Sequence, residues 1–149
     1  PRTRRWARHA PLPRELSHVG VAGLDGKLYA FGGFTDVVHI DFSQAGMPAA
    51  DFPREAFVAF ARQGLEIWDA RQHLSGNHAV SFDPLSPDRA VLTSSMYAQH
   101  HLAGAPTFVM HGSYEHAVVR GGNGWKIAEL VQKVSWMDAP PANMLAGAS

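Results

Sequence analysis

Cysteine is absent from the 149 residues of the chain. Disulfide bonds, thiol catalysis and zinc–thiolate sites are therefore excluded. No apolar run reaches the ~18 residues that a membrane-spanning helix needs, and the N-terminus shows no signal-peptide pattern. These absences lead us to expect a cytoplasmic protein with no membrane partner.

The chain also lacks an excess of charge of either sign, because 13 basic residues balance 13 acidic residues. We therefore expect no nucleic-acid partner. The sequence contains no phosphate-binding loop, no dinucleotide-binding glycine fingerprint and no G-x-S-x-G nucleophile motif. It also contains no internal repeat of the kind that a propeller or solenoid requires.

Length and composition predict a single globular domain over residues 1–149, of which 46% are apolar. Residues 1–20 form an atypical N-terminal segment rich in proline and arginine, and we expect a loose tail at 138–149. A helix is predicted after Asp51, which can cap it, with Pro53 in the first turn. Its apolar positions recur at steps of three and four residues and define one buried stripe.

The pattern changes to a period of two after residue 69, which predicts long strands joined by hairpins. The expected strands cover 71–83, 90–104, 106–120 and 125–136. Helices followed by antiparallel strands indicate an α+β fold. We predict a strongly curved antiparallel sheet with helices packed on one face, forming a cone with an internal pocket suited to a small molecule.

The sequence contains nine histidines, the side chain that gains or loses a proton near neutral pH. Alternation along the expected strand at 90–104 places His100 on its more apolar face, together with Leu92, Ser94, Met96, Ala98 and Leu102. His73 lies just after the junction between helix and strand. Two imidazoles facing one cavity could orient a water, protonate a leaving hydroxyl or take a proton beside a carbonyl.

Neither a metal nor a cofactor is expected at this pair, because a metal site needs three or four ligands. His73 and His100 could instead be half-buried strand residues with structural hydrogen bonds only. Among the carboxylates, Asp25 is flanked by apolar residues, so its pKa could be raised. The alternative is that Asp25 belongs to a Leu-Asp-Gly turn.

Six segments occur in the same order as in the nuclear transport factor 2-like superfamily, in its SnoaL-like and scytalone dehydratase-like branch. They are "FTDVVHIDFS", "FPREAFVAF", "DARQHLSGNH", "SSMYAQHHL", "HGSYEHAVVR" and "GNGWKIAEL". The chain resembles this branch over residues 34–137. The resemblance implies a SnoaL-like domain with a curved sheet and helices closing a cone.

The function implied by this resemblance is that of a cofactor-independent dehydratase, isomerase or cyclase. Such an enzyme would act on a cyclic or aromatic hydroxy-carbonyl compound, a small hydrophobic ligand. The resemblance assigns acid–base catalysis to His73 and His100, with Asp25 as the third member. We expect the substrate to be bound by Ser94, Met96, Ala98, Phe42 and Phe57. The alternative is a non-catalytic module on the same fold that binds a small ligand or mediates assembly.

Two features depart from the dehydratase pattern. Phe42 occupies the place of a tyrosine that helps to bind the substrate carbonyl, and phenylalanine cannot donate a hydrogen bond. Residues 5–33 also resemble a stretch of a kelch propeller blade, ending in "GKLYAFGG". Residues 23–33 are thus either a distorted first helix with Asp25 directed inward, which we favour, or an unrelated strand-like graft, in which case the third catalytic member is missing.

Family members often pair through the exposed face of the sheet. The resemblance therefore implies a homodimer, and the other face of the strand at 90–104 is the surface that we expect to be covered. Its polar and aromatic members are Tyr97, Gln99 and His101.

Overall fold

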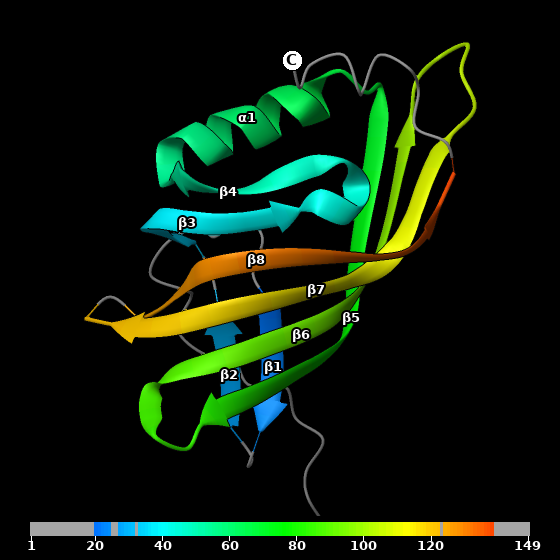
Figure 1. The fold of residues 1–149 in the computed structure, drawn as a ribbon. Helices are drawn as coiled ribbons and strands as arrows, with labels where there is room; N and C mark the ends of the chain where they lie inside the picture. Colours follow the sequence, from blue (N-terminus) through cyan, green and yellow to red (C-terminus); the bar gives the residue numbers. More distant parts are fainter. Residues whose placement is uncertain (1–19, 25–26, 32, 123, 139–149) are drawn as a thin grey trace, which may run out of the picture.

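Figure 1 shows a computed structural model that describes residues 20–24, 27–31, 33–122 and 124–138. In chain order the elements are β1 (Gly20–Leu24), β2 (Lys27–Phe31), β3 (Phe34–Phe42), the short 3-10 helix η1 (Ser43–Ala45), β4 (Met47–Pro53), α1 (Arg54–Glu66), β5 (Ala70–Asp83), β6 (Ser86–His101), β7 (Phe108–Gly121) and β8 (Gly124–Met137). The α+β class predicted from the sequence is confirmed.

Six of the strands form one curved sheet in the order β4-β3-β8-β7-β6-β5, while β1 and β2 form a separate two-stranded sheet. The large sheet is mixed rather than purely antiparallel, because β3 runs parallel to β8. The hairpin with β7 fixes the direction of β8, and β3 aligns along the remaining edge of β8. The remaining neighbours in this sheet are antiparallel, as predicted.

Register shifts bend the long strands. One lies between Gly76 and Ala79, where β5 has an extra residue, and another lies opposite His111 and Gly112, where β8 has the extra residue Ser135. An extra residue on one side of a ladder bends the strand and increases its twist. The bends give the sheet the curvature visible in Figure 1, with α1 packed near β3 and β4 at one end.

The helix predicted after residue 51 is present as α1, but Asp51 does not cap it. Asp51 belongs to β4, where its carboxylate lies 2.7 Å from His39 Nδ1. The helix begins after Pro53, which makes no side-chain capping bond. The segment 43–51 forms η1 and most of β4, because β3 supplies an edge for pairing.

The favoured first helix at 23–33 is wrong, because 20–24 and 27–31 pair as antiparallel strands. The glycines of this segment explain why strands form in place of a helix, since each glycine costs about 1 kcal/mol in a helix relative to alanine. The hairpin corresponds to the strand-like alternative. Asp25 lies outside the described residues. In the described part of the chain, no helix is long and apolar enough to cross a membrane.

Two clusters of buried side chains form the core between the sheet and the helix. The first contains Val38, Ile40, Phe57, Ala90, Leu92, Val118, Ile127 and Leu130. The second contains Trp68, Met96, Ala98, Phe108 and Met110. Tyr114 packs against both clusters, so its side chain marks the boundary between them.

Candidate active site

The register of β5 and β6 brings His73 and His100 to one face of the sheet. His73 lies opposite Ala98, and Arg71 lies opposite His100. Residues directly opposite in an antiparallel pair point to the same face, and diagonal neighbours are within reach of long side chains. The Nε2 atoms of His73 and His100 accordingly lie 2.8 Å apart, at hydrogen-bond distance.

Aromatic side chains enclose His100, which is 7% exposed, whereas His73 is more open to solvent. The ring centroid of His100 lies 5.1 Å from that of Trp68 and 5.8 Å from that of Phe108. Burial, together with smaller electrostatic contributions from His73 and Arg71, lowers the pKa of His100 to about 4. The imidazole of His100 is therefore neutral at pH 7.

One nitrogen of this buried ring has no hydrogen-bond partner among the described residues. Nε2 of His100 faces His73, whereas Nδ1 is buried without a hydrogen bond in the described part of the structure. A buried polar atom left unpaired costs about 1–3 kcal/mol. In a neutral pair one Nε2 donates and the other accepts, so Nδ1 of His100 carries either the free lone pair or the free proton. In either tautomer this nitrogen keeps an unused hydrogen-bonding capacity.

The predicted face of β6 is confirmed, because its members are buried on the side of His100. Ser94 is 5% exposed, and Met96 and Ala98 are each 3% exposed. Phe42 and Phe57 instead pack in the first core cluster, with ring centroids 6.3 Å apart. The structure thus places Ser94, Met96 and Ala98 along the strand that carries His100 and assigns the two phenylalanines to the other cluster.

Sequence reasoning missed several polar side chains on this inner face. Tyr114 lies opposite Ser94, and its hydroxyl accepts a hydrogen bond of 3.4 Å from Nε2 of Gln132. Burial raises the pKa of Tyr114, so its hydroxyl stays protonated. His116 lies opposite Leu92 on the same face, and burial lowers its pKa. Alternation along β7 could have found both residues once the register with β6 was known.

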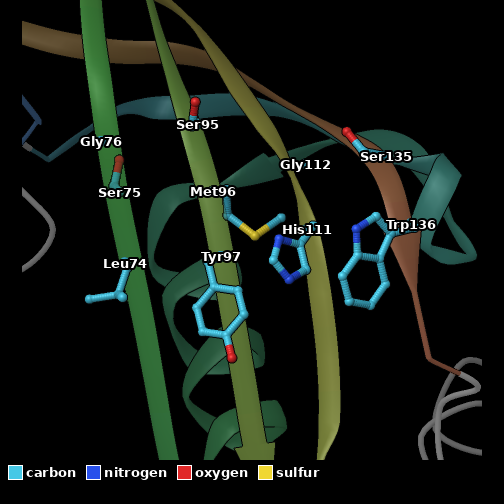
Figure 2. A pocket seen from close by; sticks show the side chains of 10 residues that line it. All are labelled: Leu74, Ser75, Gly76, Ser95, Met96, Tyr97, His111, Gly112, Ser135 and Trp136. Carbon is cyan, nitrogen blue, oxygen red and sulfur yellow. The ribbon is translucent and has the colours of Figure 1, made fainter.

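A surface groove of about 470 Å³ lies elsewhere, on the face of the sheet turned away from α1 (Figure 2). Its lining comprises Leu74, Ser75, Gly76, Ser95, Met96, Tyr97, His111, Gly112, Ser135 and Trp136. The ring of His111 stacks on Trp136 at 4.1 Å and meets Tyr97 edge-on at 4.6 Å. This open aromatic groove is distinct from the internal pocket expected beside His73 and His100.

Among the described residues, no three His, Asp or Glu side chains lie close enough together to hold a metal ion. The His73–His100 pair has an aromatic wall and one neighbouring cation, Arg71. The arrangement can accept, donate or relay a proton beside a bound organic molecule.

Comparison with known proteins identifies the domain. A family model for the SnoaL-like domain matches residues 32–131. No curated protein matches the chain. The agreement with the family model covers every element from β3 to β7 and most of β8.

Solved structures share the fold. Kfla4162 protein from Kribbella flavida is 26% identical with a TM-score of 0.66, over 76% of this chain and 78% of that one. A candidate scytalone dehydratase from Novosphingobium aromaticivorans is 16% identical with a TM-score of 0.59, over 73% and 70%. Hexachlorocyclohexane dehydrochlorinase LinA-type3 from Novosphingobium barchaimii is 16% identical with a TM-score of 0.58, over 72% and 77%.

Proposed function

The chain belongs to the family of SnoaL-like domains, and we propose that it is a cofactor-independent enzyme that moves a proton on a small cyclic or aromatic hydroxy-carbonyl compound. The observation that carries this proposal is the 2.8 Å contact between His73 and His100, with Nδ1 of His100 buried and without a partner among the described residues. A neutral buried imidazole can accept a proton from carbon or bind the departing oxygen.

The two histidines would have different roles. His100 is walled by Trp68 and Phe108 and would contact the substrate ring. His73 is more exposed and would exchange the proton with solvent through the Nε2–Nε2 hydrogen bond. Ser94, Met96 and Ala98 would line the substrate side of the same strand, with Phe42 and Phe57 farther along the inner face. Asp25, the third member that the resemblance implies, lies outside the described residues, and the pairing of 20–24 with 27–31 favours the alternative in which this third member is missing.

Similar proteins support elimination as the reaction type. The names of the two Novosphingobium proteins describe a dehydratase and a dehydrochlorinase, both of which remove a proton and a leaving group from neighbouring carbons. For this chain the equivalent step would break a C–H bond next to a carbonyl and a C–O bond one carbon further. The hydroxyl would leave as water, and the bonding pair from the C–H bond would form the new double bond.

A model β-hydroxy ketone tests this step. Elimination of water from 3-hydroxy-1-tetralone gives 1-naphthol after tautomerisation, and the product can be followed by its absorbance. We expect turnover by the native protein, with losses of about 100-fold or more in His73→Ala and His100→Ala, the size usual for a general acid or base. The matched control is His101→Ala, which changes the exposed neighbour of His100. If His73→Ala and His100→Ala converted the ketone as fast as His101→Ala and the native protein, the proposed mechanism would be excluded.

Ligand binding without catalysis is the second candidate. It is favoured by Phe42, which cannot donate a hydrogen bond to a substrate carbonyl. This function predicts that 1-naphthol binds and perturbs the ring signals of His100 while 3-hydroxy-1-tetralone is not converted. The two functions are thus separated by measuring binding and turnover on the same samples.

A further inference from the structure

Arg71 is the cation closest to the histidine pair by register. It lies directly opposite His100 in the β5–β6 ladder, and its side chain is exposed. Side chains at opposed positions have Cβ atoms about 5 Å apart. The positive charge of Arg71 reaches the imidazole, since it contributes to lowering the pKa of His100. The guanidinium and the two imidazoles therefore share one face of the sheet.

No ion pair with a described residue neutralises the charge of Arg71. Its Nη1 donates a hydrogen bond of 3.0 Å to the carbonyl oxygen of Leu65 in the last turn of α1. Among the described residues, no carboxylate lies within 4.0 Å of this guanidinium, and the nearby Asp69 accepts a hydrogen bond from the backbone of Ala103. Arg54, by contrast, forms ion pairs with Asp36 and Glu55. Arg71 thus keeps most of its five N–H donors for another partner.

The bond to Leu65 also fixes where those donors lie. Leu65 precedes the junction that carries Trp68, and Trp68 contacts the ring of His100. An anchored guanidinium loses less freedom when it binds a ligand, and its planar fork matches the two oxygens of a carboxylate. A carboxylate placed on Arg71 would put an attached ring toward His100 and its aromatic neighbours.

We infer that the substrate of this site is an anion, a cyclic or aromatic carboxylate whose charged group binds Arg71 while its ring lies against His100. This inference rests on the proposed function of the histidine pair and specifies the class of compound on which the pair acts. Arg71 contributes binding and orientation, and the proton is moved by the histidines.

The test compares two probes of the same shape, benzoate and benzamide, at pH 7 and low salt. Binding is measured by calorimetry and by the ring signals of His73 and His100 in NMR spectra. We expect benzoate to bind at least tenfold more tightly than benzamide, and the preference to weaken as salt screens the charge. We also expect bound benzoate, but not benzamide, to raise the pKa of His100, because an anion favours the imidazolium.

Substitutions assign the preference to Arg71. Arg71→Gln should lower benzoate affinity about tenfold and leave benzamide affinity unchanged, and Arg71→Lys should retain part of the preference. Arg62→Gln, which removes an exposed charge from α1, is the matched control and should change neither affinity. Equal binding of the two probes, absence of benzoate binding at millimolar concentration, or an unchanged preference in Arg71→Gln would each overturn the inference.

These outcomes are separable from the proposed function. If Arg71→Gln leaves the preference intact while His73→Ala and His100→Ala abolish turnover of 3-hydroxy-1-tetralone, the anion inference fails and the enzyme proposal stands. If benzoate selectivity depends on Arg71 but no turnover occurs, the anion site stands and the catalytic proposal fails.

Discussion

The Nε2 atoms of His73 and His100 lie 2.8 Å apart, although the two residues occupy diagonal rather than opposed positions on β5 and β6. The contact joins a solvent-accessible imidazole to one that is 7% exposed. Burial lowers the pKa of His100 to about 4, so its imidazole is neutral at pH values well above 4. This asymmetry between the two rings has consequences for stability as well as for chemistry.

Acid should destabilise the protein through His100. Its pKa in the folded state is about 4, below the ordinary histidine value of 6.5, because burial disfavours the charged ring. The unfolded state therefore binds more protons between these two pH values, and the free energy of unfolding falls as the pH drops from about 6.5 to about 4. We expect a loss on the order of 2 kcal/mol, measured by urea unfolding at pH 7 and at pH 4.5.

A substitution isolates the contribution of this residue. His100→Gln removes the titrating group and should flatten the pH dependence, leaving a smaller slope in the same direction from His116, whose pKa is also lowered by burial. His101→Gln removes the exposed neighbouring ring and should keep the native slope. A His100 ring signal that titrates near pH 6.5 in the native protein would contradict the prediction.

The two faces of β6 should differ sharply in their sensitivity to truncation. Leu92 is 2% exposed in the first core cluster, and its neighbour Val91 is 40% exposed on the other face. Leu92→Ala should lower the free energy of unfolding by about 2–5 kcal/mol, because it removes buried contacts and leaves a cavity. Val91→Ala, in the same strand, should cost less than about 1 kcal/mol by comparison. Similar losses in chemical denaturation would show that the faces are wrongly assigned.

The bulge between β7 and β8 should not tolerate a side chain at Gly112. A Cβ added there would lie 2.0 Å from the carbonyl oxygen of Lys133, a backbone atom that cannot move without breaking the ladder. Gly112→Ala should therefore destabilise the protein by about 3 kcal/mol or more, at the upper end of overpacking effects. Gly76→Ala meets no atom within 4 Å and serves as the control. Thermal unfolding of both variants provides the comparison, and equal melting temperatures would refute this account of the bulge.

Period-two alternation was enough to predict which side chains of β6 point inward. Ser94, Met96, Ala98 and His100 all follow from counting along one strand. The partner residues on β7 could not be found in this way, because a shift of one position in register exchanges the two faces of a strand. The ladder between β6 and β7 runs without a shift, but which residue of β7 faces which residue of β6 is set by contacts between the strands rather than by local sequence.

Local signals also misplaced the start of α1 and the fold of the N-terminal segment. Asp51 has the side chain of a helix cap, but pairing between β3 and β4 extends the strand through Pro53 and moves the helix start beyond it. Residues 23–33 resemble a family helix, but their glycines disfavour a helix, and the structure shows paired strands at 20–24 and 27–31. Tertiary pairing thus overrode a cap and a resemblance that each looked sufficient alone.

We expect the protein to be a homodimer that covers the outer face of its sheet. Leu74 is 53% exposed and Trp136 is 51% exposed at opposite ends of a row that also contains Tyr97 and His111. Such a row of apolar and aromatic side chains has the composition of an interface centre. Trp136→Glu should shift micromolar protein from dimer to monomer in sedimentation velocity, because a carboxylate would be buried without a partner.

The matched control for this surface is Leu85→Glu, since Leu85 is 93% exposed in the turn between β5 and β6 and lies outside the groove. It introduces the same charge at an apolar side chain and should leave the dimer unchanged. Because the outer row and the histidine pair lie on opposite faces of the sheet, Trp136→Glu should also leave the ring signals of His100 in place. A native protein that sediments as a monomer, or a Trp136→Glu variant that remains dimeric, would show that this face is not the contact between copies.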